Sequence, residues 1–154
     1  MAMSPELDAV QKAILDIHRE LFDESPSPMK LQKLCYYAQG YALAEGKPLF
    51  KDDFQAWQHG PVVPDMYQEY KDLKWRPIAA EVEPPKMEPQ VIEHLEGIVA
   101  AYGRYDGAAL STMTHRERPW ASARGDLPET ANSEATISKD TMERFFARKL
   151  RGEE

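Results

Sequence analysis

The segment from Pro28 to Gly46, "PMKLQKLCYYAQGYALAEG", constrains the fold most, because apolar residues cover most of the circumference of the helix that it would form. One apolar face at helical spacing consists of Leu31, Leu34, Cys35, Ala38 and Ala42, and Tyr37, Tyr41 and Ala44 widen it. A helix without a broad polar side must be covered by other elements on several sides. The pattern therefore predicts a central helix with the rest of the chain packed around it.

Gly40 lies in the middle of this predicted helix, where glycine costs about 1 kcal/mol relative to alanine. We expect the close approach of another backbone to compensate for that cost, since a residue without a side chain leaves room for it. Gly46 follows where helices commonly end in a left-handed residue. The helix is thus predicted to end just before Gly46.

Serine followed by proline marks the start of two helices, because serine caps a helix and proline needs no N–H at the first helical position. These pairs are Ser4-Pro5 and Ser27-Pro28. The first helix carries an apolar stripe formed by Leu7, Val10, Ile14, Ile17 and Leu21. Further helices are predicted from Pro64, over 91–102, from Asp106, from Pro119 and, after the N-cap Ser138, to the end of the chain. Residues 74–89 and 126–136 are predicted loops.

The stretch "PLFKDDFQAWQ" has no helical period, and its alternation around Phe54 to Gln58 predicts a short strand or hairpin. Gly60, Pro61 and Pro64 then turn this extended segment sharply into the next helix. We therefore predict a mostly α fold: a single compact domain over residues 1–154 with about six helices and a small β-hairpin or short strands around residues 49–63.

Composition narrows the class of protein. The chain of 154 residues suits one domain, no apolar run approaches the ~20 residues that span a bilayer, and the start lacks a signal-peptide core. A cytoplasmic protein that does not bind membranes is expected. The net charge of −7 argues against general affinity for nucleic acid, which needs clustered Lys and Arg. The single cysteine, Cys35, excludes an internal disulfide.

No catalytic, metal-binding or cofactor-binding pattern is found. The histidines His18, His59, His94 and His115 have no partners at metal-ligand spacing, and there is no nucleophile elbow or phosphate-binding glycine loop. Cys35 on the apolar helix is expected to be a core residue. "TMTHRERPW" could bind an anion through His115 and its arginines, but a solvated helix terminus is the favoured interpretation. We expect no enzyme, no metal and no cofactor, and we interpret the turn at His59 as structural.

Three stretches in this order and spacing resemble the Panacea domain, the antitoxin domain of SocA-like and phage-associated GepA-type proteins. They are "LQKLCYYAQGYALAEGKPLF", "FQAWQHGPVVPDMYQEYK" and "LSTMTHRERPWASAR", and the resemblance covers roughly residues 8 to 125. It implies an antitoxin that neutralises a co-encoded toxin protein by direct binding. It also implies a role as an adaptor that delivers the toxin to the ClpXP protease.

A nucleic-acid-binding regulator and an enzyme with an unrecognised site remain as alternatives. The predicted hairpin before a helix could act as the wing of a winged-helix domain. However, a wing that reaches DNA should carry Lys and Arg, and "FQAWQHGPVVPD" contains neither. The protein-binding interpretation is therefore favoured, and nucleic acid is not an expected partner.

Aromatic residues gather around the hairpin and suggest where a partner binds, since Tyr and Trp are enriched among interface hot spots. The predicted partner-binding residues are Tyr36, Tyr37, Tyr41, Trp57, His59 and Tyr67. Tyr36 and Tyr37 point about 100° apart on an ideal helix, so we expect that both are not equally buried. At least one of Tyr36, Tyr37 and Tyr41 should reach the surface beside the turn that carries His59.

Overall fold

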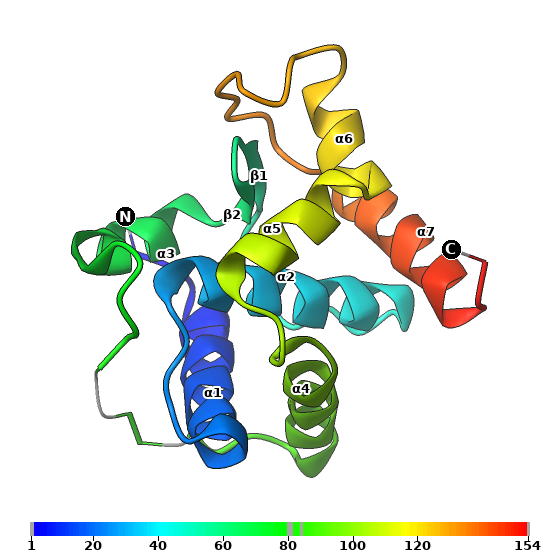
Figure 1. The fold of residues 1–154 in the computed structure, drawn as a ribbon. Helices are drawn as coiled ribbons and strands as arrows, with labels where there is room; N and C mark the ends of the chain where they lie inside the picture. Colours follow the sequence, from blue (N-terminus) through cyan, green and yellow to red (C-terminus); the bar gives the residue numbers. More distant parts are fainter. Residues whose placement is uncertain (1, 80–81, 84, 154) are drawn as a thin grey trace.

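The structure is a computed structural model that describes residues 2–79, 82–83 and 85–153. In these residues the chain forms the predicted mostly helical domain with a two-stranded antiparallel hairpin; it has seven α-helices where about six were predicted (Figure 1). The helices are α1 Pro5–Phe22, α2 Pro28–Ala44, α3 Pro64–Tyr70, α4 Pro89–Tyr102, α5 Gly107–His115, α6 Arg118–Arg124 and α7 Lys139–Leu150. The strands are β1 Gln55–Trp57 and β2 Gly60–Val62, and a 3-10 turn, Lys71–Leu73, follows α3.

Helix α2 is the centre of the molecule, which confirms the prediction from its apolar circumference. Twelve of its 17 residues are buried. It contacts α1, α3, α4, α5, α7 and β2, and Figure 1 shows it crossing the middle of the molecule between these elements. Of its buried polar side chains, Gln32 pairs through both amide atoms with the backbone of Val63, and Gln39 pairs in the same way with Leu49 and Phe50.

The predicted helix starts are confirmed by their caps. The side chains of Ser4, Ser27, Asp106 and Ser138 each accept a hydrogen bond from a backbone N–H three residues further on. Gly46 follows α2 with a φ of +75°, as expected for a left-handed stop. The stripe of α1 is buried except at its last member, since Leu21 is 51% exposed.

The prediction for Gly40 is right about close packing but wrong about its partner. A Cβ at Gly40 would overlap the ring of Phe146 in α7, so a side chain approaches there and not another backbone. The aromatic ring fills the space that the missing side chain leaves between α2 and α7. Gly40 thus acts in the contact between these two helices.

The hairpin pairs Gln55 with Val62 and Trp57 with Gly60. On its other edge, the loop after α6 was predicted to be irregular, yet it adds backbone pairing to β1: the N–H of Ala56 donates to Ala135 at 2.8 Å and the N–H of Ile137 donates to Phe54 at 2.8 Å. Residues 74–79, 82–83 and 85–88 contain no helix or strand, in agreement with the predicted loop 74–89; residues 80, 81 and 84 lie outside the described part.

A candidate binding cleft beside the hairpin

A cleft of about 620 Å³ lies between α2, the hairpin and α3, and it brings together Trp57, His59 and Tyr67. The rings of Trp57 and Tyr67 meet edge to face with their centroids 4.9 Å apart. Tyr67 is 42% exposed, His59 is exposed and Trp57 is half-buried. Three of the six predicted partner-binding residues therefore share one accessible site.

The turn between the hairpin and α3 determines where these side chains lie. Gly60 has a φ of +115°, a conformation that favours glycine, and Pro64 starts α3 so that Tyr67 faces the hairpin. The indole N–H of Trp57 donates to the side chain of Gln55 at 2.8 Å. Helix α6 is bonded to the hairpin, because the indole N–H of Trp120 donates to the backbone oxygen of Trp57 at 2.7 Å.

Lys33 of α2 also lines the cleft, although only 1% of its surface is exposed. Burial lowers the pKa of its ammonium group to about 7, because the charged form loses its hydration. The apolar part of the lining includes Met29, Val62 and Met66. The site is thus a largely apolar cleft with a buried lysine.

The other three predicted residues lie elsewhere. Tyr36 and Tyr37 are both fully buried, so the expectation that they differ in burial is wrong. Tyr41 is half-buried and lines a second cleft of about 1040 Å³ between α1, α2 and α4. None of the three tyrosines reaches the surface beside His59, so the predicted single aromatic patch is not formed.

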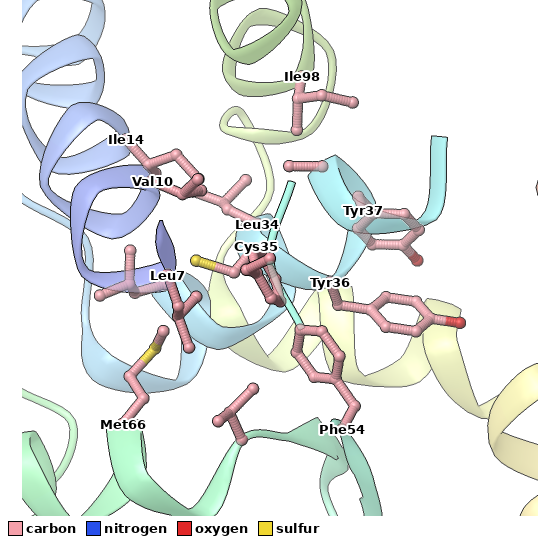
Figure 2. Packing of buried hydrophobic residues seen from close by; sticks show 14 of the residues in the cluster. Leu7, Val10, Ile14, Leu34, Cys35, Tyr36, Tyr37, Phe54, Met66 and Ile98 are labelled. Carbon is pink, nitrogen blue, oxygen red and sulfur yellow. The ribbon is translucent and has the colours of Figure 1, made fainter. Parts of the chain in front are cut away.

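Tyr36 and Tyr37 are both enclosed because α2 is covered on adjacent sides. The ring of Tyr36 packs against Phe54 and Phe146, with centroids 5.6 Å away in each case. The ring of Tyr37 stacks on Tyr102 of α4 at 4.0 Å. Figure 2 shows the two tyrosine rings next to each other, with Phe54 close to Tyr36. An angle of 100° between neighbours therefore does not expose either residue when two layers flank the helix.

Glu117, at the start of α6, is buried beside these rings and accepts a hydrogen bond from the Tyr37 hydroxyl at 3.0 Å. Burial raises its pKa to about 7, although Lys149 of α7 lies 3.8 Å away and lowers it. The solvated helix terminus predicted for "THRERPW" is thus correct for the exposed Arg116 and Arg118 and wrong for Glu117.

A family model described as the SocA-like antitoxin, Panacea domain, matches residues 31–121, which run from α2 into α6. This chain belongs to the SocA-like Panacea-domain family. It is 31% identical to the protein named Antitoxin SocA of Caulobacter vibrioides (strain NA1000 / CB15N) over 132 residues, which cover 76% of this chain and 69% of that protein. No solved structure matches.

The Panacea match contains Lys33, Trp57, His59 and Tyr67, which all line the cleft. Lys33 was not among the predicted partner-binding residues, although it lies in the quoted "LQKLCYYAQG" stretch. A lysine between the apolar positions of a central helix was the signal that could have found it. Lys71 and Lys74, which also line the cleft, could not be connected with Lys33 before α3 was placed.

The remaining histidines of this Panacea-family chain serve packing and backbone bonds. Nδ1 of His18 lies 2.6 Å from the backbone oxygen of Glu24, and Nε2 of His94 lies 2.9 Å from that of Ala38. The ring of His115 stacks on Trp120 at 4.1 Å. Cys35 is buried, which raises the pKa of its thiol. Within residues 2–79, 82–83 and 85–153, no group of three or more His, Cys, Asp or Glu could hold a metal ion.

No helix in the described part of the chain has the length and apolar character that a membrane span requires.

Proposed function

We propose that this chain is the antitoxin of a toxin–antitoxin pair, that it acts in the cytoplasm and that it neutralises a co-encoded toxin protein by direct binding. The observation that carries the proposal is the 31% identity to the protein named Antitoxin SocA across three quarters of this chain. The cleft beside the hairpin supports a binding role, because it presents Trp57 and Tyr67 as accessible amphipathic side chains. We assign no catalytic step to the chain.

A co-expression experiment tests the proposal. The product of the neighbouring small open reading frame is expressed alone and together with this chain, and growth is followed. We expect the neighbouring product to arrest growth alone, this chain to restore growth, and the two proteins to elute together from a size-exclusion column. Growth arrest that this chain does not relieve would contradict the proposal.

An adaptor role toward the ClpXP protease is the second part of this proposal, and it is supported by the resemblance to SocA-like antitoxins. Here we expect the lifetime of the neighbouring product to shorten when this chain is present, and only in cells that contain ClpX. A purely blocking antitoxin would relieve growth arrest equally well in cells without ClpX.

A nucleic-acid-binding role has less support. The hairpin and its flanks, "FQAWQHGPVVPD", carry no lysine or arginine, and the chain has a net charge of −7. A mobility-shift assay with the DNA upstream of the gene tests this role. A direct antitoxin restores growth without binding DNA, so growth rescue by a chain that gives no shift would favour the antitoxin function.

A further inference from the structure

We propose that the cleft beside the hairpin binds an acidic segment of the partner protein, in which one Asp or Glu carboxylate pairs with the ammonium group of Lys33. An apolar side chain next to that carboxylate would pack against Trp57 and Tyr67. The inference rests on the proposed function insofar as the partner is a protein. It adds the chemistry that the partner must present.

The first observation is that Lys33 has no internal partner. Among the described residues, none forms a hydrogen bond or ion pair with its Nζ, although the side chain is only 1% exposed. The other buried polar side chains in the middle of α2, Gln32 and Gln39, have both amide atoms paired with backbone groups. The Tyr36 hydroxyl of the same helix is also unpaired, but it lies in the core, whereas Lys33 lines the cleft.

The second observation is that the structure makes room for this lysine. A Cβ on Gly60 would lie 2.6 Å from Cε and 3.4 Å from Nζ of Lys33, and 2.8 Å from the hydroxyl oxygen of Thr114. The glycine in the turn thus accommodates the end of the lysine side chain. The three stretches quoted for the family resemblance meet here, since Lys33, Gly60 and Thr114 come from one stretch each.

The energetics favour an external anion. An ammonium group without a counter-ion is costly to bury, and burial lowers the pKa of Lys33 to about 7. A carboxylate that enters the cleft restores the charged form, because an opposite charge in a partly desolvated site is attracted far more strongly than in water.

The charge around the cleft points the same way. Lys71 and Lys74 line it together with Lys33, whereas Glu134 is the single acidic residue among its described lining residues. This local excess of positive charge contrasts with the net charge of −7 of the whole chain. An acidic partner segment is therefore attracted to this cleft and repelled by most of the remaining surface.

A peptide fits the cleft better than a nucleic acid does. Its volume of about 620 Å³ falls within the range of roughly 300–1,000 Å³ that is usual for ligand sites. Its walls are formed to a large extent by Met29, Val62, Met66 and the two aromatic rings. Nucleic-acid sites instead need a row of cations that follows the phosphates. The apolar walls and one buried ammonium group suit a carboxylate that has an apolar neighbour.

The test is a selection of random octapeptides displayed on phage against the full-length protein, followed by fluorescence anisotropy with the enriched peptides after synthesis. We expect the enriched peptides to share an Asp or Glu next to an aromatic or aliphatic residue. Lys33→Met should weaken their binding roughly 30-fold or more, as expected when one partner of a buried charge pair is removed. Lys47→Met, which removes the same charge from an exposed position at the second cleft, should not change it.

Lys71→Glu with Lys74→Glu provides a second test that leaves the core intact, because both side chains are exposed. This variant should weaken the same peptides several-fold, in line with exposed charge pairs. Enrichment of peptides without acidic residues, no enrichment at all, or equal binding by wild type and Lys33→Met would overturn the proposal. A single-stranded DNA 20-mer could instead displace the peptides and bind in a way that requires Lys33. That result would overturn the proposal in favour of a nucleic-acid partner.

The selection uses no toxin, so its result is independent of the co-expression experiment. Lys33-dependent peptide binding without growth rescue would contradict the antitoxin function and leave the cleft chemistry in place. Growth rescue without enrichment of acidic peptides would support the antitoxin function and contradict the proposed chemistry of the cleft.

Discussion

At the scale of single residues, two ionisable side chains are buried in different settings. Lys33 lines the cleft without an internal partner, whereas Glu117 lies among aromatic rings and accepts a bond from Tyr37. Burial shifts the pKa of both groups to about 7, downward for the lysine and upward for the glutamate. In both cases the charged form destabilises the folded state. The free energy of unfolding therefore rises with pH because of Lys33 and falls with pH because of Glu117.

Lys33→Met should increase stability and remove one source of its pH dependence. The native pKa is about 7 and the unfolded value 10.5, so the unfolded chain binds more protons between these values and the free energy of unfolding rises with pH there. The full cost is present below pH 7. We expect the variant to be more stable at pH 6 by roughly 1–4 kcal/mol, the range for buried charges replaced by apolar residues. Urea denaturation at pH 6, 7.5 and 9 measures this, and an unchanged pH slope would contradict it.

Glu117→Gln should act in the opposite pH range. The native pKa is about 7 and the unfolded value 4.5, so the native protein binds more protons between them. The stabilisation present below pH 4.5 is lost as pH rises through 7. Glutamine still accepts from Tyr37 and cannot ionise, so the variant should be more stable at pH 8 by up to about 3 kcal/mol. The same denaturation series at pH 5, 6.5 and 8 applies, and a variant as pH-dependent as the wild type would count against a buried carboxylate.

At the scale of elements, the contact between α2 and α7 depends on Gly40. Gly40→Ala places a methyl group in the ring of Phe146, and overpacking of this kind costs roughly 1–3 kcal/mol. Gly97→Ala in α4 is the matched control, because a Cβ there meets nothing within 4 Å. The control should be neutral or more stable by up to about 1 kcal/mol. Thermal melting compares the two variants.

Phe146→Leu decides whether the loss arises at this contact. In the double variant with Gly40→Ala, the smaller side chain gives the new methyl group space, so the combined loss should be smaller than the sum of the two single losses. Strictly additive losses would show that Gly40 acts elsewhere.

Local chemistry explains why the elements were predictable and their contacts were not. The helix starts at Ser4, Ser27, Asp106 and Ser138 depend on residues only three positions apart, so the sequence displays them. The partner of Gly40 comes from α7, more than one hundred positions later, and no local pattern indicates it. The same holds for the strand-like pairing of Ala135 and Ile137 with β1.

At the scale of the whole molecule, the central helix separates two accessible regions. The cleft with Trp57, His59 and Tyr67 lies beside the hairpin, while Tyr41 and Tyr102 line the cleft along α4. The sequence predicted one site that contained Tyr41 together with Trp57, His59 and Tyr67, because adjacency in the chain does not tell which side of α2 each residue reaches. Three of the six predicted partner-binding residues, which line the hairpin cleft, were thus predictable from residue type. That the three tyrosines of α2 lie elsewhere depends on how α2 packs against its neighbours.

Alanine variants in the two clefts should therefore differ in function. Tyr67→Ala removes an exposed ring from the hairpin cleft and should weaken growth rescue strongly, while the melting temperature stays nearly unchanged. Tyr41→Ala in the second cleft should retain rescue. Growth rescue at matched protein levels is the measurement. Loss of rescue in Tyr41→Ala alone would move the binding face to the second cleft.

Direct binding between this purified chain and the purified product of the neighbouring open reading frame, measured by isothermal titration calorimetry, tests the central claim. The account predicts a saturable complex with the wild-type chain, and a loss of about 2 kcal/mol or more in binding free energy for Tyr67→Ala. Growth rescue by the wild-type chain without any detectable complex would contradict it.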